Sequence, residues 1–458
     1  MRFCLKSVCL TFVLAIFASF ASNADGLDLR SEIDPLVKPL VDEQQIVGCV
    51  VGIVRDGETQ VLAYGETEKG SGKTPNGTTI YEIGSASKAF TGVLLADAVE
   101  AGLMKLDDPV QEYVPKSVKV PVKEGKPITL EHLATHTSGL PRLPNNMFPK
   151  DPRNPYADYT VKLMYEYLGG YELAQAPGEY NYSNYGMGLL GHVLAKRQRT
   201  TYERLLVDRI AKPLGMQDTC IKLDDSQKKR LAPPYNAALA PDANWDIPTL
   251  AGAGAIRSTV DDMVKFLQAS VAEDKEPVTK AIRLAFEKRH KMKDGQAIGL
   301  AWHIARDGVT RWHNGRTGGY SSWMSVIPEM KAGVVVLSNT SADKTTELGL
   351  KLTLVASGKK VEPPRERTVI KVEADVLKAY AGVYAITPEF ALTITEEDGK
   401  LAVQATGQSK LPMNAESKTK FFLRAVDAQI TFVPDKDGKV DELILHQNGI
   451  DQKATRQK

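Results

Sequence analysis

Cysteine is scarce in this sequence. The 458-residue chain contains four cysteines, and Cys4 and Cys9 lie in an N-terminal segment that we expect to be removed. Cys49 and Cys220 then remain, which is too few for a disulfide framework and does not give the Cys/His spacing of a zinc site. Because Cys49 lies in the apolar run 46–54, we expect it to be a buried small side chain rather than half of a disulfide.

An excess of charge of either sign is also missing. Lys and Arg together number 58 and Asp and Glu number 56, which gives a net charge of +2. Loss of Arg2 and Lys6 with the N-terminal segment brings the mature chain close to zero, so there is no electrostatic basis for a nucleic-acid partner. Hydrophobic residues make up 43% and charged residues 25%, which excludes collagen, a coiled coil, wholesale disorder and a multi-span membrane protein.

The N-terminus has the pattern of an export signal. Arg2 and Lys6 form a basic start, residues 8–20 carry no charge, and Ser22-Asn23-Ala24 supplies the small residues that a signal peptidase requires. The uncharged run is shorter than the ~20 residues that span a bilayer, and a retained anchor is the alternative. We predict a cleaved signal peptide over residues 1–24 and a periplasmic or secreted mature protein.

Several common catalytic motifs are absent. The chain has no Gly-x-Ser-x-Gly elbow, no His-Glu-x-x-His and no complete Walker loop. His132 and His136 are four residues apart, but Leu133 stands where a zinc protease has its Glu. The Gly-x-Gly-x-x-Gly at residues 186–191 follows no strand-like run, so it indicates close helix packing rather than a dinucleotide site. We therefore expect no metal and no cofactor.

The order of apolar runs indicates a mixed α/β fold. Strand-like runs lie at both ends of the first 360 residues, and helical patterns lie between them, which predicts one sheet built from both chain ends with a helical region inserted. Asp56-Gly57 between the first two strands is a hairpin signal, and Gly102 marks a helix end. The expected strands are 46–54, 59–64, 299–304, 321–327 and 334–338; the expected helices are 86–101, 185–196, 202–211 and 261–270; residues 140–159 are expected to be a surface loop.

A second domain is predicted at the C-terminus. The main domain is expected over residues 25–360, and a linker over 361–372 contains Pro363-Pro364 among charges. Residues 373–458 carry short alternating runs separated by turns, which predicts a small antiparallel barrel or sandwich. Its expected strands are 380–385, 391–395, 401–404, 421–423, 429–433 and 442–446.

Ser85-Ala86-Ser87-Lys88 has the Ser-x-x-Lys spacing. On a helix, positions i and i+3 share a face, so the Lys amine can reach the Ser hydroxyl. A desolvated Lys beside other cations can be neutral at pH 7 and act as the base. The motif alone is weak, because Ser226, Ser341, Ser357 and Ser417 also have Lys three residues on. Ser85 differs in that it opens directly into an apolar helix, whereas Ser341, its nearest rival, leads into a solvated stretch.

Two further motifs follow Ser85 along the chain. Tyr182-Ser183-Asn184 places a phenol, which can act as a general base if a lysine lowers its pKa, next to an amide that can hold a substrate carbonyl. His313-Asn314-Gly315 is followed by Arg316, and its glycine on an edge strand would let a substrate backbone approach and pair.

Ser-x-x-Lys, Tyr-x-Asn and His-x-Gly in this order resemble the serine β-lactamase and penicillin-binding protein superfamily. The stretches 129–133, 136–141, 177–178, 213–216, 258–263 and 334–339 resemble its class C branch, and the similarity covers about residues 27–358. It implies an antiparallel sheet flanked by helices, an α+β sandwich, together with an all-helical region. The tail resembles the lipocalin-like β-domain that follows some of these hydrolases.

The resemblance also implies roles for individual residues. Ser85 would be the nucleophile, Lys88 its activating partner, and Tyr182 the base that relays protons. Asn184 would hold the substrate and orient Lys88. His313 and Gly315 would line the substrate-binding strand. Backbone N–H groups of Ser85 and Arg316 would form the oxyanion hole.

One departure from the family pattern bears on the substrate. The β-lactamases carry Lys where His313 stands, and that Lys helps to hold a substrate carboxylate. Histidine is largely neutral near pH 7, although Arg316 could compensate. The expected function is therefore an exported acyl-enzyme hydrolase acting on a β-lactam or on D-amino-acid peptides such as peptidoglycan fragments. The alternatives are a short-chain esterase on the same fold and a catalytically idle penicillin-binding sensor.

Overall fold

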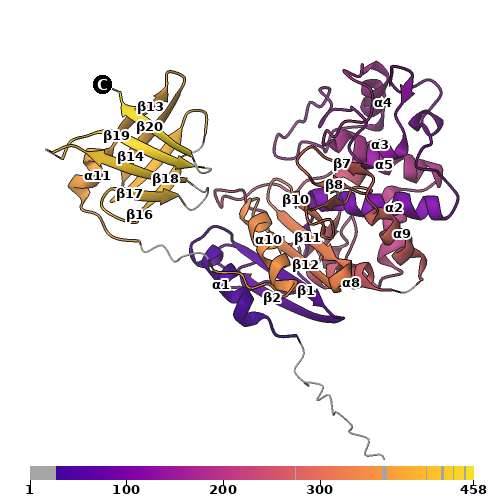
Figure 1. Ribbon diagram of the computed structural model, residues 1–458, viewed down its shortest axis with the longest axis horizontal. Coiled ribbons are helices and arrows are strands. Elements are labelled where there is room, and N and C mark those ends of the chain that lie inside the picture. Colours follow the sequence, from indigo (N-terminus) through magenta and orange to yellow (C-terminus); the bar gives the residue numbers. More distant parts are fainter. Residues whose placement is uncertain are drawn as a thin grey trace, which may run out of the picture.

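The computed structural model describes residues 27–273, 275–363, 369–408, 410–423, 426, 428–436, 438–447 and 450–457. The predicted signal peptide and the middle of the predicted linker lie outside these residues. Figure 1 shows two bodies, a mixed domain of helices and sheet and a smaller barrel at the C-terminal end.

The central sheet of the larger domain joins both ends of its chain. Its eight strands have the order β2-β1-β12-β11-β10-β9-β8-β7, and neighbours pair antiparallel. The prediction of one sheet built from both chain ends is confirmed, because β1 pairs with β12 from Cys49–Ser338 to Arg55–Ala332. The strands are β1 (Gly48–Arg55), β2 (Glu58–Gly65), β7 (His290–Lys291), β8 (Ala297–Ile298), β9 (His303–Ile304), β10 (Arg311–Arg316), β11 (Ser321–Ile327) and β12 (Ala332–Ser338).

Helices cover both faces of this sheet. Helices α1 (Arg30–Asp42) and α10 (Lys344–Ala356) share an apolar cluster with Cys49, Val51 and Ile53 of β1. Val50 and Val54 point to the other face and pack into a second cluster, as the two-residue period of a strand requires. That second cluster contains α2 (Ser87–Glu100), α8 (Val260–Val271) and α9 (Pro277–Phe286).

The first hairpin and the cysteines agree with expectation. Asp56 and Gly57 both have positive φ, 51° and 86°, which is the conformation of a tight hairpin turn between β1 and β2. Cys49 is buried and its thiol is free, and Cys220 is also free. The cysteine prediction is therefore confirmed.

A helical region follows α2 and precedes α8. Its elements are α3 (Leu130–Ala134), α4 (Val161–Gly170), α5 (Asn184–Arg197), α6 (Tyr202–Leu206), a π-helical turn (Val207–Ala211) and α7 (Asp225–Lys228). The glycines of residues 186–191 lie on α5, where a Cβ at Gly188 would come within 2.5 Å of Leu250 and a Cβ at Gly191 within 2.9 Å of Gly252. Close packing is thus the reason for this glycine pattern.

Short elements connect these parts. They are the 3₁₀ turns η1 (Gly84–Ala86), η2 (Val110–Glu112), η4 (Ala251–Ala253) and η5 (Pro328–Met330), the pair β3 (Tyr81–Glu82) and β6 (Arg257–Ser258), and the pair β4 (Val122–Lys123) and β5 (Lys126–Pro127). Turn η1 leads directly into α2, so the chain changes from strand to helix within residues 81–87.

The C-terminal region is a closed antiparallel barrel, as predicted. Helix α11 (Ala374–Tyr380) precedes strands β13 (Gly382–Thr387), β14 (Phe390–Glu397), β15 (Lys400–Ala405), β16 (Leu411–Ala415), β17 (Lys420–Leu423), β18 (Ala428–Pro434), β19 (Val440–Gln447) and β20 (Ile450–Arg456). The barrel closes where Tyr384 and Ala385 of β13 pair with Arg456 and Thr455 of β20. Tyr384, Phe421 and Phe432 fill its interior.

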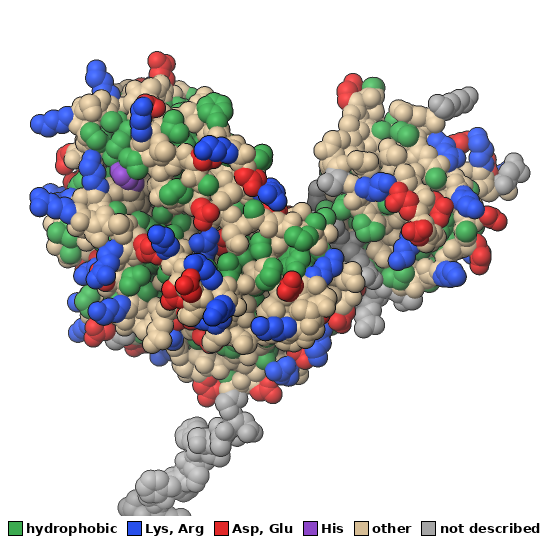
Figure 2. Space-filling view, turned by 180° about the vertical axis from the view of Figure 1, so that it is seen from behind, with side chains coloured by type: hydrophobic (Ala, Val, Ile, Leu, Met, Phe, Trp, Pro, Cys, Tyr) green, Lys and Arg blue, Asp and Glu red, His purple; other side chains and the backbone are tan. Residues whose placement is uncertain are grey.

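The surface mixes charges of both signs. Figure 2 shows Lys and Arg side chains interspersed with Asp and Glu over the face seen from behind. Among the residues that the structure describes, no helix is long and apolar enough to span a bilayer.

Candidate active site

The turn that carries Ser85 lies directly against strand β10. Gly84 has φ +51°, in the left-handed region, and a Cβ there would lie 2.7 Å from the backbone nitrogen of Arg316. A Cβ at Gly315 would lie 1.9 Å from the carbonyl oxygen of Ile83. Glycine is therefore needed on both sides of this contact, which places half-buried Ser85 beside the end of β10.

Lys88 lies one helical turn after Ser85 and is fully buried. Its Nζ is 3.0 Å from Ser85 Oγ and donates to the carbonyl oxygen of Ala253 at 2.6 Å. Burial lowers the pKa of Lys88 well below its usual range, and the positive charge of Arg142 lowers it further. A neutral amine in this position can accept the Ser85 proton while it donates to Ala253.

Tyr182 lies against the same lysine, just before α5. The Lys88 Nζ is 4.9 Å from the centre of the Tyr182 ring. Burial raises the pKa of Tyr182, while a hydrogen bond with Ser85 opposes that shift. The condition for a general base, a phenol pKa lowered by the lysine, is not met here, because loss of solvent outweighs the neighbouring groups. Tyr182 is thus a neutral phenol, able to give a proton.

His136 holds the Tyr182 segment in place. Its Nδ1 accepts a hydrogen bond from the Ser183 backbone N–H at 3.1 Å, and its carbonyl accepts from the Asn181 N–H at 2.7 Å. Its ring lies 4.4 Å from the Tyr182 ring. These contacts join residues that lie more than 40 positions apart in the chain.

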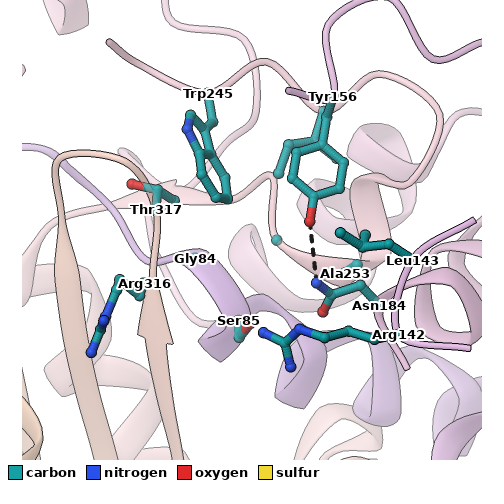
Figure 3. A pocket seen from close by; sticks show the side chains of 12 residues that line it. Gly84, Ser85, Arg142, Leu143, Tyr156, Asn184, Trp245, Ala253, Arg316 and Thr317 are labelled. Atoms are coloured by element: carbon teal, nitrogen blue, oxygen red, sulfur yellow. Dashed lines mark hydrogen bonds between the residues drawn. The ribbon is translucent and has the colours of Figure 1, made fainter. Parts of the chain in front are cut away.

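Asn184 faces the cavity without touching Lys88. Its Nδ2 donates to the Tyr156 hydroxyl at 3.1 Å (Figure 3). Its Oδ1 is buried and has no hydrogen-bond partner among the described residues. Lys88 is held by the Ala253 carbonyl, and the Asn184 Oδ1 is available to a substrate N–H.

His313 lies at the centre of β10 and is 1% exposed. Its Nδ1 is 2.6 Å from the Asn314 carbonyl oxygen, so Nδ1 carries the proton. Burial lowers the pKa of His313 well below its usual range, and His303 and Lys88 lower it further. His313 is therefore uncharged and supplies no cation where the β-lactamases have Lys.

The Arg316 side chain is paired with an acid. Its Nη2 forms an ion pair with Asp343, and Figure 3 shows the guanidinium turned away from Ser85. On its other side, strand β10 pairs with β9 only at Arg311 and Trp312. The rest of β10, which bears Gly315, faces the Ser85 turn, so β10 is an edge strand over part of its length.

Two cavities meet at Ser85. One, of about 230 Å³, has mainly apolar walls that include Leu143, Tyr156, Trp245 and Ile247. The other, of about 380 Å³, has polar walls that include Tyr182, His303 and Asn314. Ser85, Arg142 and Arg316 line both. The nucleophile thus has an apolar compartment on one side and a polar compartment on the other.

The sequence matches a family model over most of the sheet domain. The model of the Beta-lactamase family matches residues 33–357. The chain belongs to this family. A second family model, described as a domain of unknown function (DUF3471), matches residues 366–458 and thus the barrel.

Individual members of the Beta-lactamase family are similar to this chain in sequence and in structure. The chain is 31% identical to the D-alanyl-D-alanine-carboxypeptidase/endopeptidase AmpH of Escherichia coli (strain K12) over 63% of this chain and 78% of that protein. It is 24% identical to penicillin-binding protein 4* of Bacillus subtilis (strain 168) over 94% of this chain and 99% of that protein. A β-lactamase/D-alanine carboxypeptidase structure from Yersinia pestis, complexed with citrate, has 25% identity and a TM-score of 0.63 over 72% of this chain and 97% of that one. The predicted serine hydrolase family is confirmed.

A buried ion pair positions the aromatic wall of this β-lactamase-family site. Glu82 and Arg257 are joined at 3.1 Å. Glu82 accepts from the Trp245 backbone N–H at 3.0 Å, and Arg257 donates to the Trp245 carbonyl at 3.0 Å. The Trp245 ring packs 5.3 Å from that of Tyr156. This polar network thus holds the backbone of Trp245, a residue that lines the same cavity as Ser85.

Sequence reasoning missed Arg142. It directly follows the 136–141 stretch that resembles the class C branch, and this position in the sequence could have indicated it. Its guanidinium lies 5.2 Å from the centre of the Tyr182 ring. In Figure 3 it points toward Ser85 from the side opposite Arg316. Within the described part of the chain, no group of three or more His, Cys, Asp or Glu side chains could hold a metal ion.

Proposed function

We propose that this protein is an exported acyl-enzyme hydrolase that cleaves D-amino-acid peptides of the D-Ala-D-Ala carboxypeptidase type and is acylated by β-lactams. The observation that carries the proposal is the 3.0 Å contact between Ser85 Oγ and the buried amine of Lys88. The names of the relatives, β-lactamase and D-alanyl-D-alanine carboxypeptidase, support this choice of substrates.

In the acylation step, the neutral Lys88 amine takes the proton of Ser85 Oγ. The oxygen attacks the substrate carbonyl carbon, and the carbonyl electron pair moves onto its oxygen. Ser85 and Arg316 line both cavities, and their backbone N–H groups stabilise that oxyanion. The Ala253 carbonyl keeps Lys88 directed at Ser85 throughout.

In the collapse of the intermediate, the leaving nitrogen needs a proton. Tyr182 is a neutral phenol that borders the polar cavity, so it donates its proton there and is reprotonated from Lys88. The C–N bond breaks and the acyl group stays on Ser85. Water then attacks the ester, gives its proton back through the same groups, and releases the acid and free Ser85.

The compartments suggest how the substrate lies. The leaving group must reach the Tyr182 proton, so it occupies the polar cavity. The acyl portion then occupies the apolar cavity, against Trp245 and Tyr156. The free Asn184 Oδ1 accepts an N–H from the acyl portion. A peptide with a small apolar D-residue and a polar leaving residue fits this arrangement.

The esterase remains the second candidate because of His313. Its ring is uncharged, whereas β-lactam and peptide C-termini carry a carboxylate that a cation would stabilise. An uncharged acyl ester makes no such demand. We also propose that residues 1–24 are cleaved on export; N-terminal sequencing of exported protein that starts near Asp25 would support this.

The test combines mass spectrometry with turnover. The mature protein is mixed with a penicillin, a chromogenic cephalosporin, an N-acyl-D-Ala-D-Ala peptide and p-nitrophenyl acetate, with Ser85→Ala in parallel. We expect an adduct on Ser85, release of D-Ala, and loss of both in Ser85→Ala, whose melting temperature stays within a few degrees. Ester hydrolysis with no adduct and no D-Ala would favour the esterase. A permanent adduct with no turnover of any substrate would favour a sensor, and unchanged activity in Ser85→Ala would refute the assignment.

A further inference from the structure

A carboxypeptidase must recognise the carboxylate of its leaving residue, and few cations are available here. Two cationic side chains line the polar cavity, Arg142 and Arg316. Lys88 is buried behind Ser85 and is held by Ala253. His313 supplies no charge, because its ring is neutral. The choice is therefore between the two arginines.

The surroundings of the two arginines differ. Arg316 is already paired with Asp343 and is turned away from Ser85 (Figure 3). No carboxylate among the described residues is paired with Arg142, and its guanidinium is stacked over the Tyr182 ring at 5.2 Å. Stacking on an aromatic face leaves the edge of the guanidinium free for two parallel hydrogen bonds to a carboxylate.

Backbone hydrogen bonds fix the position of Arg142 from which its side chain extends. Its carbonyl oxygen accepts from the Asn184 N–H at 3.0 Å and from the Tyr185 N–H at 3.2 Å. The residue is thereby joined to the first turn of α5, beside the Tyr-x-Asn motif. The exposed side chain takes no part in these bonds, so a substitution at 142 leaves them intact.

We propose that Arg142 is the carboxylate receptor of this enzyme and determines its preference for substrates with a negatively charged leaving group. The proposal rests on the proposed function, because it presumes that such substrates are cleaved at Ser85. It moves the charge-binding role from the β10 position, where His313 stands, to the opposite wall of the cavity.

The test uses two aryl esters of N-acetyl-D-alanine that differ in one group. The leaving phenol carries a meta carboxylate in one ester and a meta carboxamide in the other. The ratio of their kcat/KM values isolates carboxylate recognition from any general change in catalysis, including one caused by the effect of Arg142 on Lys88. The ratio is measured in the wild type, Arg142→Gln, Arg142→Lys and Arg316→Gln.

We expect the wild type to prefer the carboxylate ester. Arg142→Gln should lower that preference by about tenfold, since a charge-assisted bidentate contact is lost. Arg142→Lys should keep part of the preference, because it retains the charge without the fork. A wild type with no preference, an unchanged ratio in Arg142→Gln, or a loss of preference in Arg316→Gln instead would overturn the proposal.

Failure of the proposed function gives a different result. Cleavage of N-acyl-D-Ala-D-Ala is assayed in the same preparations. If the peptide is not cleaved but the ester ratio collapses in Arg142→Gln, the carboxypeptidase activity is wrong and the receptor assignment stands. If the peptide is cleaved and the ratio does not change, the carboxypeptidase activity stands and the assignment of Arg142 as the receptor is wrong.

Discussion

Buried polar side chains distinguish the sheet domain from the barrel. In the sheet domain, Lys88, His313, Glu82 and Arg257 are all at most 9% exposed. Among the described residues of the barrel, no polar or charged side chain other than tyrosine is buried, and the interior consists of residues such as Phe421, Phe432 and Leu443. The two regions thus use their interiors for different purposes.

Burial of a polar or ionisable group costs stability unless it is well paired. The sheet domain bears this cost where Ser85 and Lys88 meet and where Glu82 and Arg257 hold Trp245. In the barrel, buried polar atoms without a hydrogen-bond partner are limited among the described residues to Thr395 Oγ1 and Glu416 Oε2, and the interior is filled mainly with apolar side chains. The ionisable groups of the candidate site, Lys88 and His313 among them, thus lie in the interior of the first region.

The largest effect is expected from Lys88→Met, which removes the buried amine but keeps a similar volume. Loss of the base should reduce the rate of Ser85 acylation by about 10³-fold or more. The free energy of unfolding, in contrast, should rise in this variant at pH values below the unfolded pKa of lysine. In the unfolded chain Lys88 binds its proton up to about pH 10.4, whereas the folded pKa is lowered, so wild-type stability falls as pH decreases between these two pKa values.

Lys88→Met should therefore be more stable than the wild type at pH 6, and its advantage should shrink as pH rises toward 10. Urea denaturation at several pH values measures this advantage, and stopped-flow acylation measures the rate. A variant that is less stable at pH 6, or that acylates at a rate near that of the wild type, would contradict a neutral buried base.

Phe432→Ala should have the largest effect on stability in the barrel. Phe432 is 1% exposed and stacks 4.1 Å from the Tyr380 ring. Truncation should destabilise the barrel by about 3–5 kcal/mol, while ester turnover at 25 °C stays unchanged because no catalytic group lies there. Differential scanning calorimetry checks the first effect and an ester assay the second. Loss of turnover in the folded variant would mean that the barrel supports the active site.

A smaller effect is expected from His303→Phe at acid pH. Burial lowers the pKa of His303 to about 4, so between about pH 6.5 and pH 4 the unfolded chain binds a proton that the folded chain does not. His303 should contribute a loss of up to about 3 kcal/mol over that window, and His303→Phe should remove this contribution while keeping the stack on Trp312.

Denaturation curves at pH 7.5, 6, 5 and 4 test this prediction. The variant and the wild type should differ little in pH dependence above pH 7.5, which serves as the internal control. An equal loss of stability in the two proteins from pH 6.5 to 4 would show that His303 makes no contribution of its own.

The parts of the fold with strong local patterns were predictable. The strand expected over 321–327 is β11 with the same bounds, and the Asp56-Gly57 turn joins β1 to β2. The strand expected over 299–304 is reduced to residues 303–304. Ala301 there has a positive φ of 61°, and the Leu300 N–H bonds to Ala285 rather than to a strand.

Elements that lack such a pattern were missed. Helix α1 contains Pro35 and Pro39, which usually end a helix, but here packing against β2 and α10 holds it. Strand β20 is almost entirely polar, and Ala454 is its only buried residue. Its place is set by closure of the barrel, which cannot be read from residues 450–456 alone.

The candidate site was predictable where it consists of motifs. Ser85, Lys88, Tyr182, His313 and Gly315 stand in a recognisable order, and the structure brings them together. The Ala253 carbonyl, the Tyr156 hydroxyl and the Arg142 guanidinium were not found. A backbone carbonyl has no sequence signature, and the other two lie in a long loop whose path is fixed only by tertiary contacts such as the bond between Asn154 and Asp246.

Position 253 combines a main-chain contact to the catalytic lysine with a variable side chain. The group there that orients Lys88 is a main-chain oxygen, so exchanging the side chain does not delete it. The same residue borders the apolar cavity. Libraries that vary position 253 can therefore reshape the acyl compartment while leaving the proton acceptor aligned, and such a site separates the evolution of selectivity from that of reactivity.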